Sequence, residues 1–226
     1  MMSYMNSILI EDKPTYKISP SLINGMWRYK NKTKQDKRAF DDFVVRLRRE
    51  FNENQWSARG KDFEKRFQQG EYENLNVLLS EGSKTSVYGQ KVLEFNKLNL
   101  KINGICDVIN EKNKVIIDLK RVNKVDIEEY NNSVQHLIYF YLFDNIDKFY
   151  YIFAIGSSLS NEKEELEFKA LYYERPDNLE EILNEKIVEF FIFLEENNLI
   201  ETYKEFNTDI KLDDNNFHKE EDIEEE

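Results

Sequence analysis

Three consecutive stretches of strand-like sequence between Thr85 and Arg121 constrain most strongly how this chain can fold. They are rich in apolar and β-branched residues, and breaks occur near Asn96–Lys97 and at the polar stretch "NEKNK" (110–114). Short polar breaks of this kind join neighbouring strands through hairpin-type turns. The pattern therefore predicts three successive strands in the middle of the chain, around which the remaining elements must be arranged.

The flanking sequence predicts helices before these strands, and a helix, two strands and a last helix after them. Ser19-Pro20 is typical of a helix start, because Ser is a good N-cap and Pro is tolerated at the first helical position. Apolar residues spaced by three and four mark the amphipathic helices. This order predicts an α/β or α+β domain with a mixed sheet flanked by helices. The helices are expected at about 20–30, 37–51, 60–69, 126–144 and 176–206, and the two further strands at 148–156 and 165–174.

Composition limits the class of protein. The chain has 226 residues, of which 40% are hydrophobic, so it can build a core, and it contains no apolar run long enough for a transmembrane helix. Its single cysteine, Cys106, excludes an internal disulfide, and we read no signal peptide at the N-terminus, so a cytoplasmic protein is expected. We expect one domain over residues 1–210 and a disordered acidic tail over 211–226.

Charge is distributed unevenly along the chain. The formal net charge is -12, which argues at first against a nucleic-acid partner. However, residues 1–70 hold 15 Lys and Arg against nine Asp and Glu, whereas residues 211–226 hold eight Asp and Glu. The basic half is suited to a phosphate backbone while the acidic tail stays in solvent. The alternative is that the basic runs are simply solvated helix faces.

Three charged residues interrupt the two strands that flank "NEKNK". Side chains alternate between the faces of a strand, so Asp118 and Lys120 point to one face while Leu119 points to the other. Asp107 lies on the preceding strand, and a hairpin would bring its carboxylate to the same face as that of Asp118. Two neighbouring carboxylates repel each other unless a proton or a cation intervenes. Lys120 offers one positive charge, and a divalent cation would offer two.

This arrangement is suited to phosphodiester hydrolysis. Carboxylate oxygens are hard ligands that favour Mg²⁺ or Mn²⁺, and such an ion polarises phosphate and activates water. Lys120 would orient the attacking water or offset the negative charge that builds on the phosphate. The competing interpretation is a surface hairpin with an incidental Asp-x-Lys, and these three residues alone do not decide between the two.

Further motifs follow the order of a known family. "RGKDFEKRF" with Glu64 precedes the strands, Gly104 stands three positions before Asp107, and Gln135 and Tyr139 form a Gln-x-x-x-Tyr motif on the next helix. Together with Asp-x-Lys and the early "ISPSLI", this series resembles the PD-(D/E)XK nuclease superfamily, in its RecB-like and phage exonuclease branch. The resemblance covers roughly residues 18–175 and implies a restriction-endonuclease-like core.

The resemblance also implies roles for individual residues. Asp107 and Asp118 would bind the metal together with the backbone carbonyl of Leu119, and Lys120 would be the catalytic lysine. Glu64 would complete the metal site, directly or through water. The residues that would bind substrate or brace the site are Gln135, Tyr139, Arg59 and Arg121.

The function expected from this resemblance is a Mg²⁺- or Mn²⁺-dependent deoxyribonuclease, most simply an exonuclease in phage or mobile-element DNA recombination or processing. A structure-selective or nicking endonuclease and an inactive nuclease fold that serves as a binding or inhibitor module stay open as alternatives. One cysteine excludes an iron–sulfur cluster, and no complete phosphate-binding loop for ATP is present. DNA is the expected partner, with a single-strand annealing or other recombination protein and a homo-oligomer as further possibilities, and without a membrane.

Overall fold

The computed structural model describes residues 14–31, 37–50, 55–95, 98–156 and 166–209. Within these residues, six strands form one sheet that contains both parallel and antiparallel pairs. The expected mixed sheet is therefore confirmed. The strands are β1 (Thr15–Ile18), β2 (Ser83–Phe95), β3 (Leu98–Asn110), β4 (Val115–Val122), β5 (Lys148–Ile155) and β6 (Glu167–Glu174).

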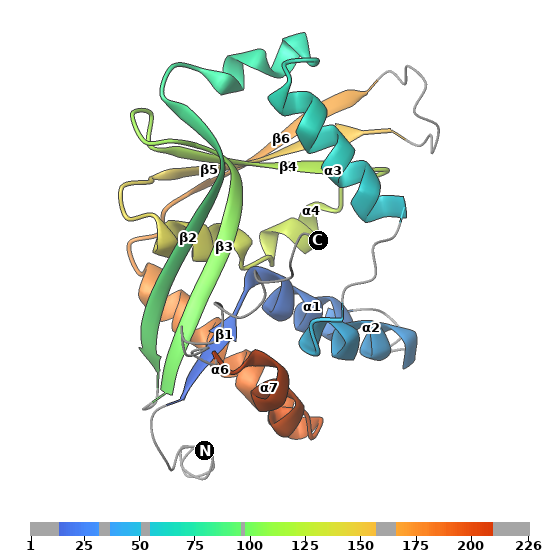
Figure 1. The fold of residues 1–226 in the computed structure, drawn as a ribbon, viewed down its shortest axis with the longest axis vertical. Coiled ribbons are helices and arrows are strands. Elements are labelled where there is room, and N and C mark those ends of the chain that lie inside the picture. Colours follow the sequence, from blue (N-terminus) through green and yellow to red (C-terminus); the bar gives the residue numbers. More distant parts are fainter. Residues whose placement is uncertain (1–13, 32–36, 51–54, 96–97, 157–165, 210–226) are drawn as a thin grey trace, which may run out of the picture.

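Helices flank the sheet on both faces (Figure 1). Most of them begin or end within a few residues of the predicted positions. The described helices are α1 (Pro20–Asn31), α2 (Lys37–Leu47), α3 (Gln55–Gln68), the 3-10 helix η2 (Glu73–Leu79), α4 (Ile127–Asn131), α5 (Gln135–Leu142), α6 (Leu179–Glu196) and α7 (Ile200–Asn207).

Strand β3 organises the sheet because it pairs with three other strands. It is antiparallel to β2 along almost its whole length, parallel to β1 near its start and antiparallel to β4 only near its end. Strand β4 then pairs with β5 in parallel, and β5 pairs with β6 antiparallel. The long β2–β3 ribbon thus extends well past the β4–β5–β6 half of the sheet (Figure 1). The predicted antiparallel pairing of the strands on either side of "NEKNK" is confirmed.

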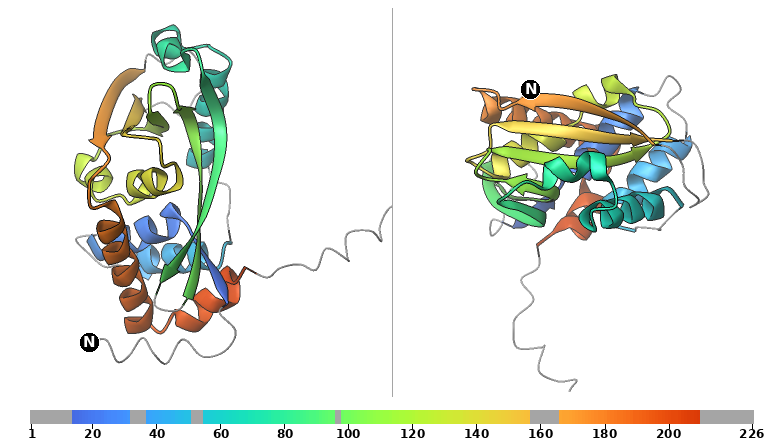
Figure 2. Two further views of the ribbon diagram at one scale, coloured as in Figure 1. Left: turned by 90° about the vertical axis from the view of Figure 1, so that its left-hand side faces the viewer. Right: turned by 90° about the horizontal axis from the view of Figure 1, so that it is seen from above.

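Two groups of buried residues cover the opposite faces of the sheet. The larger core joins the sheet to α1, α2, α5, α6 and α7, and the smaller core joins it to α3 and η2. Figure 2 shows this layering, with α3 on one side of the sheet and α5 and α6 on the other. Asp118 and Lys120 lie on the α5 side of β4, whereas Ile117 and Leu119 pack into the smaller core.

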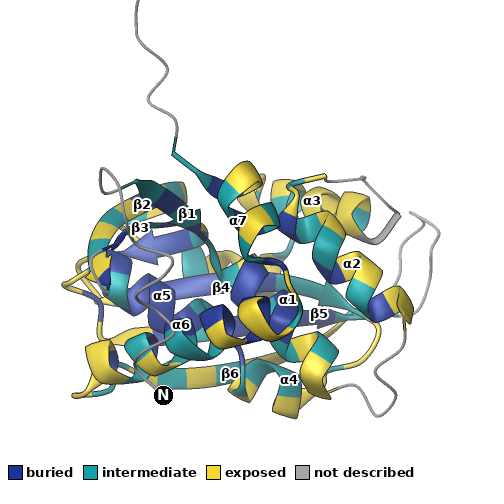
Figure 3. Cartoon of the chain, turned by 90° about the horizontal axis from the view of Figure 1, so that it is seen from below, coloured by how far each residue is buried: buried dark blue, intermediate teal, exposed yellow. Residues whose placement is uncertain are grey.

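Burial follows the layers. Strands β4 and β5 are mostly buried, whereas α1 and α6 expose their outer faces (Figure 3). Of the helices in the described residues, none has both the length and the apolar character that crossing a bilayer requires.

Two predicted helices are divided in the structure. The sequence 126–144 forms α4 and α5, separated at Asn132–Val134, so the prediction of one helix is wrong. The last helix is divided into α6 and α7 around Asn198, whose φ of 57° ends the helical path. The prediction also missed β1, a strand of only four residues that pairs with β3, and the short η2. Residues 211–226, the expected acidic tail, lie outside the described part of the chain.

Candidate active site

Regular pairing is interrupted on both sides of β3 at Asp107: the ladder with β4 ends there, and the ladder with β2 omits one pair and then resumes. The β3–β4 ladder contains Val108↔Ile117, Ile109↔Ile116 and Asn110↔Val115, and the next pair in this register would set Asp107 opposite Asp118. The ladder ends before that pair, as expected where two like charges would oppose each other directly.

On the other edge of β3, the β2 register leaves out the pair Ser86↔Asp107, and Ser86 has a φ of 53°. The side chains also change face here, because Cys106 belongs to the larger core and Val108 to the smaller one. The strand is therefore irregular at the aspartate that the sequence singled out.

A side-chain contact replaces the missing ladder between β3 and β4. The backbone N–H of Leu119 donates to Asp107 Oδ2 at 2.6 Å. In an extended strand the N–H and C=O groups of one residue point to the same side, so the Leu119 carbonyl also points toward the gap between the two strands. The two carboxylates and this carbonyl thus border one opening in the sheet.

Asp118 is almost completely buried, with 2% of its side chain exposed. Its Oδ2 forms an ion pair with the ammonium group of Lys120, and its Oδ1 accepts a hydrogen bond from Gln135 Nε2 at 2.6 Å. Gln135 Nε2 also donates to the Tyr139 hydroxyl at 3.3 Å, and Tyr139 donates in turn to the carbonyl of Ile105. Helix α5 therefore bridges β3 and β4 where their own pairing has ended.

The local sequence explains how α5 comes so close to β3. Gly104 has no side chain, and a Cβ there would lie 2.7 Å from Tyr139 Cε1. Only glycine leaves room for the tyrosine ring against the strand. The Gly-x-x-Asp and Gln-x-x-x-Tyr motifs are thus in direct contact.

Electrostatic coupling links these charged residues. Burial, reinforced by the neighbouring Asp118 charge, raises the pKa of Asp107 to about 8, although Lys120 opposes the shift. Burial also raises the pKa of Asp118, again against the effect of Lys120. For Lys120, burial alone would lower the pKa, but the two aspartates outweigh it and raise the pKa above its ordinary value. The site therefore holds its lysine charged, and this single charge could not neutralise both carboxyl groups if each lost its proton.

Glu64 approaches this group from α3. It is half-buried, and burial raises its pKa, while Lys120 lowers and Asp118 further raises it. Nevertheless, no three His, Cys, Asp or Glu side chains in the described residues come close enough together to hold a metal ion. Among the described residues, Glu64 therefore does not form a three-carboxylate group with the two aspartates.

The two arginines that the sequence predicted to bind substrate or brace the site, Arg59 and Arg121, lie on different elements. Arg59 is half-buried on α3, in the same helix as Glu64. Arg121 donates from Nη1 to the carbonyls of Val122, Ala154 and Gly156 at 3.0–3.1 Å. It therefore ties the ends of β4 and β5 together, next to Lys120 in sequence.

A cavity of about 680 Å³ opens onto Lys120, Gln135 and Tyr139. Helix α1 forms its opposite wall with Ser21, Asn24, Trp27 and Arg28, none of which the sequence analysis had assigned to the site. The "ISPSLI" motif pointed to the start of this helix, but the helix has no further feature that would place these residues at the cavity.

A second cavity, of about 860 Å³, lies between Lys30 and α6. Its lining includes five glutamates, so it would repel a polyanion, and it contains no residue of the Asp107–Asp118–Lys120 group. Of these two cavities, the one of about 680 Å³ is the one that adjoins Lys120.

No protein-family model and no curated protein matches the sequence. Among solved structures, the chain is similar to a phage-related exonuclease from Haemophilus somnus 129PT, with a TM-score of 0.48 and 15% identity over 79% of this chain and 93% of that chain. It is also similar to an alkaline exonuclease (LHK-Exo) from Laribacter hongkongensis, with a TM-score of 0.48 and 14% identity over 84% of this chain and 92% of that chain.

Proposed function

We propose that this protein is a metal-dependent deoxyribonuclease that hydrolyses phosphodiester bonds at the Asp107–Asp118–Lys120 site. The observation that carries the proposal is the interrupted β3–β4 ladder, where two carboxylates and a charged lysine meet beside a cavity. A purely structural ion pair would not need the second carboxylate, whose pKa burial and Asp118 raise to about 8. Of the three residues, Lys120 lines the cavity, and strongly shifted groups at a cavity are typical of functional sites.

The donor set fits Mg²⁺ or Mn²⁺. Asp107, Asp118 and the Leu119 carbonyl would hold the ion, and all three supply hard oxygen ligands. Mg²⁺ is usually bound by one or two carboxylates together with water and substrate phosphate, so a third protein carboxylate is not required. When bound, such an ion supplies a Lewis acid and lowers the pKa of water.

The chain's own residues would perform the remaining tasks. Lys120 lies against Asp118 and lines the cavity, so its ammonium group can donate to the attacking water or to a phosphate oxygen. Gln135 holds Asp118 in place through Oδ1, and Tyr139 fixes Gln135 to the β3 backbone. On the opposite wall, Trp27 offers an aromatic face to the nucleotide chain. Arg28 offers a cation that a phosphate would share with Glu129, its ion-pair partner at 2.6 Å.

Within this class, we propose an exonuclease that acts on DNA ends during phage or mobile-element recombination, the setting that the sequence motifs imply. The chemistry at the site is the same for an endonuclease. A digest of linear and covalently closed circular DNA, with Mg²⁺, with Mn²⁺ and with EDTA, tests both the nuclease proposal and the narrower exonuclease proposal. We expect linear DNA to be degraded only with metal and circular DNA to survive. Cleavage of the circle would replace the exonuclease by an endonuclease, and no cleavage of any linear, nicked or branched DNA would refute the nuclease proposal.

A further inference from the structure

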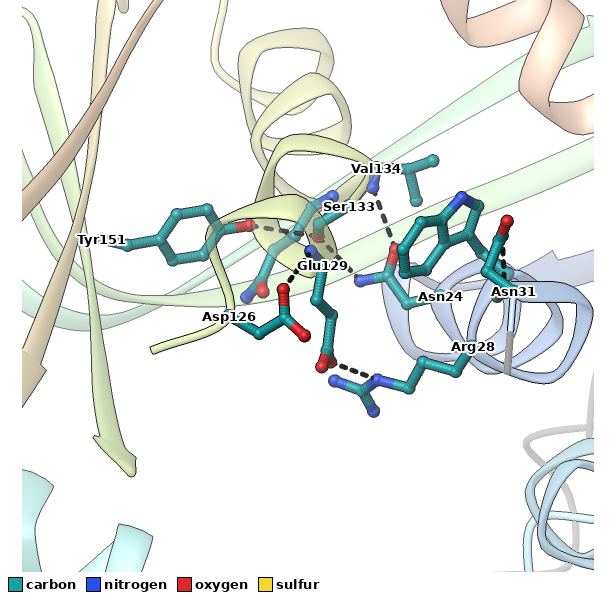
Figure 4. A network of polar contacts seen from close by, with 10 residues as sticks. Asn24, Arg28, Asn31, Asp126, Glu129, Ser133, Val134 and Tyr151 are labelled. Carbon is teal, nitrogen blue, oxygen red and sulfur yellow. Dashed lines mark hydrogen bonds and ion pairs between the residues drawn. The ribbon is translucent and has the colours of Figure 1, made fainter. Parts of the chain in front are cut away.

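The junction between α4 and α5 depends on a residue of α1. Asn24 Nδ2 donates to Ser133 Oγ at 2.9 Å, and Asn24 Oδ1 accepts from the backbone N–H of Val134, also at 2.9 Å. Ser133 Oγ accepts from the backbone N–H of Gln135 at 3.2 Å and contacts the Tyr151 hydroxyl at 3.1 Å. These contacts join α1, the α4–α5 junction and β5 into one polar network (Figure 4).

This network provides hydrogen-bond acceptors for backbone N–H groups at the start of α5, where the N-cap residue makes no side-chain cap of its own. The first N–H groups of a helix have no partner within the helix and need one from elsewhere. Val134, at the N-cap position, makes no side-chain capping bond. Asn24 and Ser133 supply acceptors for the N–H groups of Val134 and Gln135 instead. An asparagine 109 positions away from Ser133 in sequence thus helps to fix where α5 begins.

The first residue of α5 is the one that holds the candidate metal ligand. The backbone of Gln135 bonds to Ser133, and its side chain bonds to Asp118 Oδ1 at 2.6 Å and to Tyr139. A shift of the helix start would move that amide away from Asp118. Partners behind the metal ligands commonly set ligand orientation, and their loss lowers metal affinity or activity by about 10–100-fold.

We propose that Asn24 is a positioning residue. From helix α1, across the cavity, it caps the start of α5 and thereby holds the Gln135 side chain in contact with Asp118. The importance of Asn24 for catalysis rests on the proposed nuclease function. The effect of Asn24 on the position of Gln135 does not rest on it, because the Gln135–Asp118 hydrogen bond is present without metal or DNA. Asn24 also lines the cavity, so the same side chain belongs to the cavity wall and to the support of the site.

The test replaces Asn24 by Leu, which keeps the approximate volume but cannot accept or donate, and by Asp. In Asn24→Asp, one carboxylate oxygen can still accept from Val134 N–H, and the Ser133 hydroxyl can donate to the other. The first measurement is the NMR signal of the Gln135 side-chain amide in the metal-free protein, assigned by its loss in Gln135→Met. The second is Mn²⁺ binding, followed by electron paramagnetic resonance without DNA.

We expect Asn24→Leu to shift the Gln135 amide signal and to weaken Mn²⁺ binding by about 10-fold, with Asn24→Asp closer to the parent. The matched control is Asn31→Leu on the same helix, because among the described residues the hydrogen bond of the Asn31 amide stays within α1, to the Trp27 carbonyl at 2.9 Å. If Asn24→Leu does not fold, Ser133→Ala is judged by the same two measurements.

Equal Gln135 signals and equal Mn²⁺ affinities in Asn24→Leu and Asn31→Leu would overturn the proposal. A parent protein that cuts DNA while Asn24→Leu behaves like the control would refute the positioning role and leave the nuclease standing. A parent that cuts no DNA while the Gln135 signal responds as expected would refute the nuclease and leave the positioning role standing.

Discussion

Two strands of the same sheet carry an acidic residue, any residue and then a lysine. On β4 these are Asp118 and Lys120, and on β6 they are Glu167 and Lys169, whose Nζ and Oε1 atoms lie 3.0 Å apart. Both pairs therefore form ion pairs along one strand. They differ in burial: the exposed side-chain fractions are 2% and 28% on β4 but 61% and 57% on β6.

The position of each strand explains this difference. In the described sheet, β6 pairs only with β5, and its Glu167–Lys169 pair faces water, where an ion pair contributes about 0–1 kcal/mol. Strand β4 lies between β3 and β5, packs against α3 on one face and meets Gln135 of α5 on the other, and its neighbour β3 adds a second carboxylate. The same short motif is thus a surface contact on one strand and a charged site on the other. Burial and the missing ladder, rather than the spacing alone, make the motif on β4 a candidate active site.

The largest expected difference between the two pairs is catalytic. We expect Asp118→Asn and Lys120→Ala each to lower Mg²⁺-dependent DNA cleavage by at least about 10²–10³-fold, because each removes a preorganised charge from the site. Glu167→Gln and Lys169→Ala should cleave like the parent. The measurement is the rate of nucleotide release from linear DNA, with a melting curve for every variant. Comparable losses in the β4 and β6 variants would show that the β4 pair is not the active site.

The next difference concerns stability without metal. Lys120→Met leaves Asp118 without its counter-ion, and we expect it to lower the free energy of unfolding by at most about 3 kcal/mol, the low end for a broken buried pair. Lys169→Met should change it by less than about 1 kcal/mol. Urea unfolding in EDTA measures both. Added Mg²⁺ should stabilise Lys120→Met more than the parent, because a competing positive charge has gone, and equal stabilisation would contradict that expectation.

The smallest effect is the dependence of stability on pH. The pKa of Asp107 is about 8 in the folded protein and 3.8 as a free side chain, so the folded state holds a proton that the unfolded state releases. The stability from this group is fully present below pH 4 and is lost as the pH rises through 8. We expect the free energy of unfolding in EDTA to fall between pH 6 and 8.5 by at most about 1.4 kcal/mol per pH unit.

Asp107→Asn should flatten that slope, whereas Glu167→Gln should leave it unchanged. Metal affinity should change in the opposite direction over the same range, because the carboxylates must lose their protons to bind the ion. Identical slopes in the parent and Asp107→Asn would show that Asp107 titrates normally.

Strand alternation and the "NEKNK" turn were sufficient to predict that Asp107, Asp118 and Lys120 lie together, and the family resemblance implied that Gln135 and Tyr139 join them. Motif order and strand alternation carry that information locally, along neighbouring elements. The sequence also contains Glu167-x-Lys169, which matches the Asp-x-Lys pattern equally well in isolation. Only the preceding Asp107 and the following Gln-x-x-x-Tyr motif distinguish the buried pair from the exposed one.

The features that sequence reasoning missed depend on distant partners. The break between α4 and α5 is stabilised by Asn24, and nothing near Ser133 in the sequence indicates that partner. Strand β1 has only four residues and forms its ladder with β3, so its local pattern is too short to identify. The break before α7 could have been predicted more easily from the sequence, because Asn198 follows another Asn and asparagine adopts a positive φ more readily than most residues.

The pairing of β1 with β3 also has a consequence for folding kinetics. Thr15 pairs with Asn99, and the Asn24–Ser133 contact spans 109 positions, so both require the closure of long loops. Contacts between distant segments form more slowly than hairpins such as β2–β3, because the chain entropy is lost before the contact is gained. In refolding from urea, the β2–β3 hairpin should therefore form early and the α1 wall of the cavity late. Recovery of DNA cleavage would then follow the slowest folding phase. Its rate would measure how fast β1 and α1 pack onto the rest of the protein, rather than how fast the β2–β3 hairpin forms.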